Sequence, residues 1–229
     1  IMLLVASDFD GTLYVNDINI ISKNIEYINK LRENNHLFAI ITGRGLSIRE
    51  LLKKYNISYD FLICENGAII YDNKDNILYS CYLEQDDIDS TIGIIKKYDL
   101  KFIIDTGDKY ITDLNQKFSN VASIFLDRKT INDVNEMLKI VKKNTNTYSY
   151  ISPNWINIVN MNVNKKKTLE KLETILENKY KICPIGDAIN DVEMISFFDG
   201  GVMKNHEKEL DNLPNKNYDT LADYIKELI

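Results

Sequence analysis

The apolar positions at the start of the chain form short continuous runs that alternate with amphipathic segments. Residues 3–9 and 36–41 are apolar runs of the kind that form strands buried on both faces of a parallel sheet. Between them, residues 22–34 place their apolar side chains on one side of a predicted helix, with Ser22 as its N-cap. This alternation predicts an α/β fold with a doubly wound, mostly parallel sheet.

The alternation of apolar runs and amphipathic segments continues through one more predicted helix and strand, and it returns near the end of the chain. The Ser-Ile-Arg-Glu segment that begins at Ser47 matches a capping box, so it predicts a helix to about residue 55. Residues 61–64 form a third predicted strand. Near the end of the chain we expect strands at residues 181–185 and 201–203, and helices at residues 168–178, 191–198 and 221–228.

The middle third of the chain breaks this rhythm. Its predicted strands are short and joined by hairpin turns, as across Ser152-Pro153-Asn154, and two amphipathic helices lie at residues 86–98 and 131–143. This pattern predicts a separate α+β unit of antiparallel strands and two helices. We expect a Rossmann-like core at 1–82 and 161–229, interrupted by an inserted α+β cap at 83–160.

Composition narrows the class of protein. The chain has 229 residues, 45% of them hydrophobic, and a formal net charge of −6. It can therefore bury a substantial core, and it lacks the basic footprint of a nucleic-acid-binding protein. Two histidines, and three cysteines without metal-ligand spacing, argue against a zinc site or a histidine-based triad.

No apolar run has the length of a membrane span, and the start of the chain does not resemble a signal peptide. We therefore expect a cytoplasmic protein that binds neither nucleic acid nor membrane. We expect it to be a monomer or a weak homodimer.

Polar and charged residues gather where the predicted parallel strands end. Ligands of open α/β sheets bind beyond the carboxyl ends of the strands, so these residues are the candidates for a functional site. In chain order they are Asp8, Asp10, Thr42, Gly43, Arg44, Lys165, Asp187, Asn190 and Asp191.

The pair Asp8 and Asp10 poses an electrostatic question, because residues i and i+2 of an extended segment face the same way. Two carboxylates at such a short distance repel each other, and one of them would take up a proton unless a cation lay between them. Asp187 and Asp191 add two more carboxylates, and such oxygen ligands without histidine or cysteine suit Mg²⁺ held together with a substrate phosphate. We therefore expect a Mg²⁺ site for phosphoryl transfer, with these four aspartates as ligands.

The same residues suggest a division of roles. A carboxylate can attack phosphorus and form an aspartyl phosphate, and Asp8 is the better candidate because it lies nearer the rigid strand. Asp10 would act as general acid to the leaving oxygen and later as base for water. The Thr42 hydroxyl and the backbone at Gly43 would hold phosphoryl oxygens, while the Lys165 ammonium would offset negative charge. The expected partner is a small phosphorylated metabolite.

Four motifs in a fixed order resemble those of the haloacid dehalogenase superfamily. They are Asp-Phe-Asp-Gly-Thr from Asp8, Ile-Thr-Gly-Arg from Ile41, the lysine after the insert, and Gly-Asp-Ala-Ile-Asn-Asp from Gly186. The position and α+β pattern of the insert resemble the type IIB cap of the Cof-like phosphatases of sugar phosphates and related compounds. Residues 62–72 resemble the segment before that cap, and Asn66 within them is a candidate for a hinge or for substrate contact.

The resemblance covers nearly the whole chain and implies specific roles. Asp8 would be nucleophile and metal ligand, and Asp10 would be the acid/base with its backbone carbonyl on Mg²⁺. Asp187 would bind the metal directly, and Asp191 would support the metal shell mostly through water. Asn190 would lie near the phosphate, together with the residues already assigned to it.

Several alternatives remain open at this point. The motif lysine falls within three consecutive lysines, and counting back from the following leucine selects Lys165 over Lys166 or Lys167. Asp191 could be only a charge in the first turn of a helix, and Arg44 is interpreted as a solvated loop residue. A phosphomutase or phosphotransferase acting on a sugar phosphate is the alternative enzyme, and a non-catalytic phosphate-binding module is the third hypothesis.

Overall fold

The computed structural model describes all of residues 1–229, and the chain forms two compact units. The core unit contains Ile1–Leu78 and Asn164–Ile229, and the second unit contains Tyr79–Val163. The two ends of the chain therefore build one unit together, and the middle of the chain builds the other. Whether the second unit acts as a cap stays a prediction at this point.

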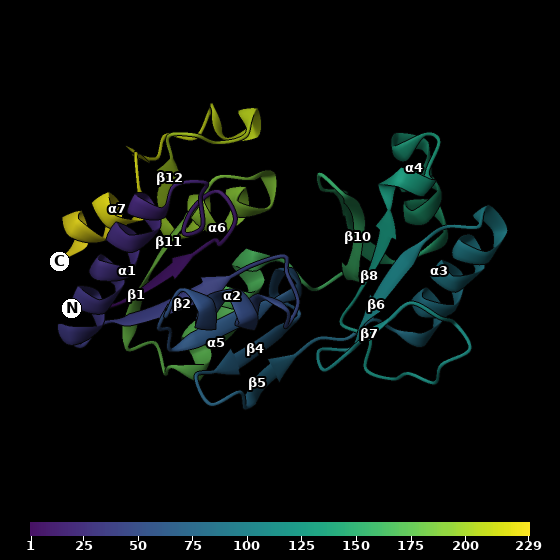
Figure 1. The fold of residues 1–229 in the computed structure, drawn as a ribbon, viewed down its shortest axis with the longest axis horizontal. Coiled ribbons are helices and arrows are strands. Elements are labelled where there is room, and N and C mark those ends of the chain that lie inside the picture. Colours follow the sequence, from purple (N-terminus) through teal and green to yellow (C-terminus); the bar gives the residue numbers. More distant parts are fainter. The chain divides into compact units, whose positions relative to one another are not determined.

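An eight-stranded sheet forms the centre of the core unit, in the order β13-β12-β11-β1-β2-β3-β4-β5 (Figure 1). Its strands are β1 (Met2–Ser7), β2 (Leu37–Ile41), β3 (Phe61–Cys64), β4 (Ile69–Asp72), β5 (Ile77–Ser80), β11 (Tyr180–Gly186), β12 (Gly201–Met203) and β13 (Asn217–Tyr218). The strands from β13 to β3 pair in parallel, and β4 is antiparallel to β3. This confirms the predicted α/β class with a mostly parallel sheet.

Five helices belong to the core unit: α1 (Ile18–Glu33), α2 (Ile48–Lys54), α5 (Lys165–Ile175), α6 (Val192–Phe198) and α7 (Leu221–Leu228). Helix α1 packs beside α7, so the purple and yellow ends of the chain lie together in Figure 1, and α5 packs beside α6. β1 is buried from its second residue onward, which matches the apolar run predicted there. None of the helices combines the length and the apolar character that a membrane crossing requires.

Two predicted helix starts in the core unit are wrong, those of α1 and of α5, which begins at Lys165 and not at residue 168. Helix α1 begins a turn earlier than expected, because the Asp17 carboxylate accepts the free N–H of Asn19 at 2.9 Å and caps the helix there. Ser22 lies inside the helix and donates its hydroxyl to the Ile18 carbonyl at 2.8 Å. Helix α2 begins directly after Ser47 as predicted, but Ser47 makes no side-chain cap bond, since its own φ of −56° and ψ of −20° are already helical.

The second unit is a five-stranded antiparallel sheet in the order β7-β6-β8-β10-β9, with two helices. Its elements are α3 (Gln85–Tyr98), β6 (Phe102–Asp105), β7 (Tyr110–Ile111), β8 (Ser123–Asp127), α4 (Val134–Asn144), β9 (Thr147–Ile151) and β10 (Trp155–Asn160). Alternate residues of the central strands, such as Ile104, Ile124 and Ile158, join apolar residues of both helices in one core. This antiparallel sheet with its helices confirms the predicted α+β character of the middle third.

The start of α4 differs from the expectation of residue 131. A 3₁₀ turn, Arg128–Thr130, comes first, and α4 begins only at Val134. The Asp133 carboxylate accepts the N–H of Glu136 at 3.0 Å, so this aspartate fixes the helix start.

Candidate active site

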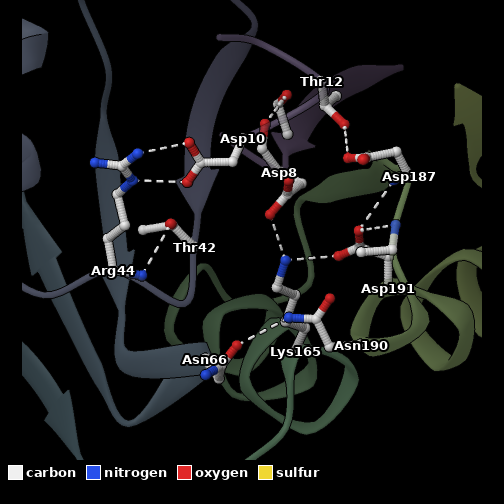
Figure 2. A network of polar contacts seen from close by, with 12 residues as sticks. Asp8, Asp10, Thr12, Thr42, Arg44, Asn66, Lys165, Asp187, Asn190 and Asp191 are labelled. Carbon is white, nitrogen blue, oxygen red and sulfur yellow. Dashed lines mark hydrogen bonds and ion pairs between the residues drawn. The ribbon is translucent and has the colours of Figure 1, made fainter. Parts of the chain in front are cut away.

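The ends of three parallel strands and the start of one helix bring the predicted site residues together (Figure 2). Asp8 follows β1, Thr42 follows β2 and Asp187 follows β11, while Lys165 is the first residue of α5. Because the carboxyl ends of neighbouring parallel strands meet at one edge of the sheet, residues far apart in the sequence become neighbours there. The core unit alone supplies every side chain of this group.

Lys165 lies at the centre of the group. Its Nζ is 2.5 Å from Asp8 Oδ1 and 2.6 Å from Asp191 Oδ1, and its side chain is only 1% exposed. The next lysine, Lys166, forms an ion pair with Glu170 at 2.9 Å along its own helix. Of the three consecutive lysines, Lys165 is therefore the one that contacts these aspartates.

Asp191 uses both of its carboxylate oxygens inside the protein. Oδ1 contacts Lys165, while Oδ2 accepts the backbone N–H groups of Asp187 at 3.0 Å and Ala188 at 3.1 Å. A β-carbon at Gly186 would lie 2.3 Å from Asp191 Oδ2, so the close approach requires glycine at that position. Asp191 is thus more than a charge at a helix start, because it orders the loop after β11 and holds the lysine.

Asp187 is oriented by a residue that the sequence did not single out. The Thr12 hydroxyl donates to Asp187 Oδ1 at 2.7 Å. The intervening turn requires Gly11, which has a φ of +86° and where a β-carbon would lie 2.3 Å from Asp187 Oδ2. The Gly-Thr pair that carries this contact ends the Asp-Phe-Asp-Gly-Thr motif, in which only the two aspartates were predicted to be site residues.

The electrostatics of the group are dominated by buried carboxylates. The ligand oxygens of Asp8, Asp187 and Asp191 all lie within 4.8 Å of one another. Burial raises the pKa of Asp8 well above its ordinary value, with Lys165 opposing the shift and the other two carboxylates adding to it. Burial also raises the pKa of Asp187 to about 6, against the hydrogen bond from Thr12.

Three carboxylates face a single ammonium in this group, so negative charge is in excess. Burial disfavours the charged form of Lys165, but Asp191 and Asp8 outweigh that effect and raise its pKa. The donor atoms are all hard carboxylate oxygens, with no histidine or cysteine in the group. This combination of excess charge and oxygen donors fits a divalent cation such as Mg²⁺.

Asp10 does not point with Asp8, and the expectation that the two side chains face the same way is wrong. Figure 2 shows Asp8 directed to Lys165 and Asp10 directed to Arg44. Strand β1 ends at Ser7, and the next residues form a tight turn, so the alternation of an extended segment no longer applies. The close group of carboxylates therefore does not include the Asp10 side chain.

The interpretation of Arg44 as a solvated loop residue is also wrong, because its guanidinium is bound to Asp10. Its Nε donates to Asp10 Oδ2 and its Nη2 to Asp10 Oδ1, both at 2.7 Å. The pair is partly exposed, and its two-point geometry is the one in which arginine and carboxylate bind most strongly.

The loop after β2 is connected to two other segments through Asn66. The backbone N–H of Asn66 donates to the Thr42 carbonyl at 2.9 Å, and its side-chain Oδ1 accepts from Asn190 Nδ2 at 2.9 Å. A β-carbon at Gly43 would lie 3.1 Å from that same Oδ1. Asn66 therefore joins the three predicted phosphate-binding positions Thr42, Gly43 and Asn190, a bridging position that the sequence could not show.

Comparison with known proteins gives consistent matches along most of the chain. A family model described as haloacid dehalogenase-like hydrolase matches residues 5–120 and 108–220. The 5-amino-6-(5-phospho-D-ribitylamino)uracil phosphatase of Bacillus subtilis is 32% identical over 206 residues, which cover 84% of this chain and 79% of that protein. The phosphoglycolate phosphatase of Sulfurisphaera tokodaii is 27% identical over 198 residues, or 86% and 78% of the two chains.

The fold also has solved counterparts. The structure of a haloacid dehalogenase-like hydrolase from B. subtilis superimposes with a TM-score of 0.84 and covers 100% of both chains. At 15% sequence identity this similarity concerns the fold alone.

Proposed function

This chain belongs to the haloacid dehalogenase-like hydrolase family and is a hydrolase of the phosphatase class, and from that premise we propose that it is a Mg²⁺-dependent phosphatase acting on a small phosphomonoester through an aspartyl phosphate on Asp8. The observation that carries the proposal is the buried contact of 2.5 Å between Asp8 and Lys165. It lies within the group completed by Asp187 and Asp191. A carboxylate held by a cation beside a set of metal-type donors is suited to attack phosphorus.

The proposed metal ligands are the carboxylates of Asp8, Asp187 and Asp191, with the backbone carbonyl of Asp10. When bound there, Mg²⁺ would offset the charge of the carboxylates and of the phosphoryl oxygens. Lys165 would supply a further positive charge next to Asp8 throughout the reaction, because both of its partners are fixed inside the protein.

In the proposed reaction, an Asp8 oxygen forms a bond to phosphorus while the bond to the leaving oxygen breaks. Asp10 gives a proton to the leaving oxygen and later takes one from the water that hydrolyses the aspartyl phosphate. Thr42, Gly43 and Asn190 would hold phosphoryl oxygens, and their links through Asn66 support this grouping.

The substrate we propose is a sugar phosphate or a similar small phosphorylated metabolite. The two enzymes compared above are named for a phosphorylated ribitylamino compound and for phosphoglycolate, both of them small phosphorylated molecules. We propose further that the inserted middle of the chain, expected at 83–160, is a cap that selects the leaving group. The chemistry would then lie in the core unit, and the choice of substrate in the second unit.

The direct test replaces Asp8 and Asp10 one at a time and measures hydrolysis of p-nitrophenyl phosphate with and without Mg²⁺. Asp8→Asn should lower kcat by at least about 10³-fold, because the amide is no nucleophile. Asp10→Asn should lower it by roughly 10²–10⁴-fold, the usual contribution of an acid or base. The matched control is Asp75→Asn, an exposed aspartate paired with Arg49. Wild-type turnover by Asp8→Asn, or full activity in excess EDTA, would contradict the proposal.

A further inference from the structure

The contact between Arg44 and Asp10 has no role in the function proposed above. The guanidinium donates to both oxygens of the carboxylate at 2.7 Å each. Such a two-point contact fixes the plane of the carboxylate as well as its distance, which a single ammonium contact does not do. The structure therefore gives Asp10 one defined orientation.

Both partners of this contact are held by their own surroundings. The backbone N–H of Arg44 donates to the Thr42 hydroxyl at 3.1 Å, and its carbonyl accepts from the N–H of Glu65 at 3.1 Å. The guanidinium lies 5.6 Å from the ring centre of Phe9, which is fully buried and stacks on Tyr14 at 5.2 Å. The arginine is thus fixed at its backbone and at its charged end.

The turn that carries Asp10 is equally well defined. The N–H of Gly11 donates to the Tyr14 carbonyl at 2.9 Å, and the N–H of Tyr14 donates to the Phe9 carbonyl at 2.7 Å. These bonds close the turn around Asp10 from both sides. Since backbone and side chain are both held, the carboxylate cannot rotate freely without breaking the contact with Arg44.

Asp10 also differs from the other aspartates of the site in its access to water. Its side chain is 50% exposed, whereas the side chains of Asp8 and Asp191 are 9% and 0% exposed. A carboxylate offers about four lone-pair sites, and Arg44 occupies two of them. The remaining sites are free to accept a hydrogen bond from a water molecule that arrives from solvent.

We propose that Arg44 is a positioning residue, which holds Asp10 in the orientation that accepts a proton from the water that hydrolyses the aspartyl phosphate. This inference rests on the proposed function. In the step concerned, the water oxygen forms a bond to phosphorus and the bond between phosphorus and the Asp8 oxygen breaks. The water proton goes to Asp10, and the products are inorganic phosphate and the free Asp8 carboxylate.

The test is Arg44→Met with p-nitrophenyl phosphate, whose p-nitrophenolate leaves without needing a proton. kcat/KM then reports formation of the aspartyl phosphate, and kcat includes its hydrolysis. We expect kcat to fall about tenfold or more, as part of the usual contribution of a base. KM should fall in proportion, so that kcat/KM stays unchanged. Rapid mixing should show a burst that rises, relative to the wild type, toward one p-nitrophenolate per enzyme.

Two further variants separate positioning from a general effect on the fold. Arg44→Lys keeps the charge but offers a single nitrogen, so its kcat should lie between those of the wild type and Arg44→Met. Arg32→Met is the matched control, because Arg32 also forms a two-point contact with an aspartate: its Nε and Nη2 lie 3.1 and 2.8 Å from the Asp60 oxygens. Asp60 directly precedes β3, so this contact lies at the opposite edge of the sheet from the site. This control should leave the burst unchanged, and urea unfolding of each variant checks that it is folded.

The outcomes are distinct. If kcat and kcat/KM of Arg44→Met fall by the same factor and KM stays constant, Arg44 acts in the formation of the aspartyl phosphate, and the inference is overturned. Unchanged kinetics in Arg44→Met, or a burst in Arg32→Met equal to that in Arg44→Met, would do the same. If Arg44→Met does not fold, wild-type kinetics of Arg44→Lys overturn the inference. If the wild-type enzyme forms no aspartyl phosphate, the proposed function is wrong, and the inference that rests on it is wrong as well. If the wild-type enzyme forms the aspartyl phosphate but the Arg44 variants have wild-type kinetics, only the inference is overturned.

Discussion

The core unit and the second unit both bury charged side chains, but they use them in opposite ways. In the core unit, Asp8, Lys165 and Asp191 contact one another directly, with distances of 2.5 and 2.6 Å at the lysine. Asp187 adds a third carboxylate whose oxygen lies within 4.8 Å of the others. The charges therefore interact mainly with other charges, and the sum is negative.

In the second unit, the buried carboxylates stand apart and each serves a backbone group. Asp87 accepts the N–H of Asn146 at 2.7 Å, which connects α3 to the segment before β9. Asp105 accepts the N–H of Gly107 at 2.7 Å, which closes the turn between β6 and β7. Each of these charges accepts a backbone N–H, which is an ordinary structural use of a buried carboxylate.

The difference shows how a reaction centre can be told from a structural polar cluster in this molecule. A buried charge destabilises the fold unless it is paired or hydrogen-bonded. Asp87 and Asp105 each accept a backbone N–H through Oδ1 and contact no other charged side chain of such a cluster, although Asp105 Oδ2 is buried without a hydrogen-bond partner. The core cluster remains out of balance, with pKa values of Asp8 and Asp187 raised by burial, and such an arrangement is typical of functional sites.

The largest expected effect comes from removing the only cation of the core cluster. Lys165→Met would leave Asp8 and Asp191 buried without their partner, so the free energy of unfolding should fall by about 3–5 kcal/mol. Hydrolysis of p-nitrophenyl phosphate should be lost as well. Urea unfolding in EDTA at pH 8, together with the phosphatase assay, measures both effects.

Lys166→Met is the matched control for this experiment. It removes an adjacent lysine whose ion pair with Glu170 spans one helical turn, and such a pair contributes about 0.3–0.5 kcal/mol. If the two variants lose equal stability and activity, the core cluster has no special electrostatic role and the comparison between the units fails.

A smaller effect should follow from adding Mg²⁺ at different pH values. Burial raises the pKa of Asp187 from 3.8 to about 6, so the folded metal-free protein holds more protons than the unfolded chain in this range. This group therefore makes the metal-free protein less stable as the pH rises toward about 6. Mg²⁺ needs the deprotonated carboxylates, so its stabilising effect should increase over the same range.

At pH 7.5, Mg²⁺ at 100 times its Kd should add about 2.7 kcal/mol and raise Tm by roughly 5–10 °C. At pH 5 the rise should be clearly smaller. Thermal unfolding with MgCl₂ or with EDTA at both pH values is the measurement, and Asp187→Asn should abolish most of the difference. An equal rise at both pH values would disprove the link between the metal and these carboxylates.

The sequence was sufficient for the class of fold and for the grouping of the main site residues. Apolar runs predicted the parallel strands, and the carboxyl ends of such strands must meet at one edge. Asp8, Thr42 and Asp187 each follow a strand of this parallel sheet, so their order along the chain was enough to bring them together. Lys165 begins α5, which follows β10 of the second unit, and its place was predicted from the resemblance of the motifs.

The contacts around these residues could not be predicted in the same way, because they depend on the backbone of turns. The rule for extended segments failed at Asp10, since the strand had already ended at Ser7. Thr12 and Asp187 are 175 residues apart, and their hydrogen bond depends on the left-handed conformation of Gly11. Asn66 likewise acts through a φ of +58° that no pattern of apolar and polar residues specifies.

The smallest expected effect concerns the second unit. Asp87→Asn keeps an oxygen that can accept the N–H of Asn146 and loses only the charge, so the free energy of unfolding should fall by about 1 kcal/mol. For a chain of this size that lowers Tm by roughly 2–4 °C. Asp89→Asn on the exposed side of α3, where the carboxylate accepts only from Gln85, should change stability by less than about 0.5 kcal/mol. Hydrolysis of p-nitrophenyl phosphate should stay within twofold in both variants, because neither Asp87 nor Asp89 belongs to the cluster of Asp8, Asp187 and Asp191. A tenfold loss of turnover in folded Asp87→Asn would mean that the buried charges of the two units are not separate in function.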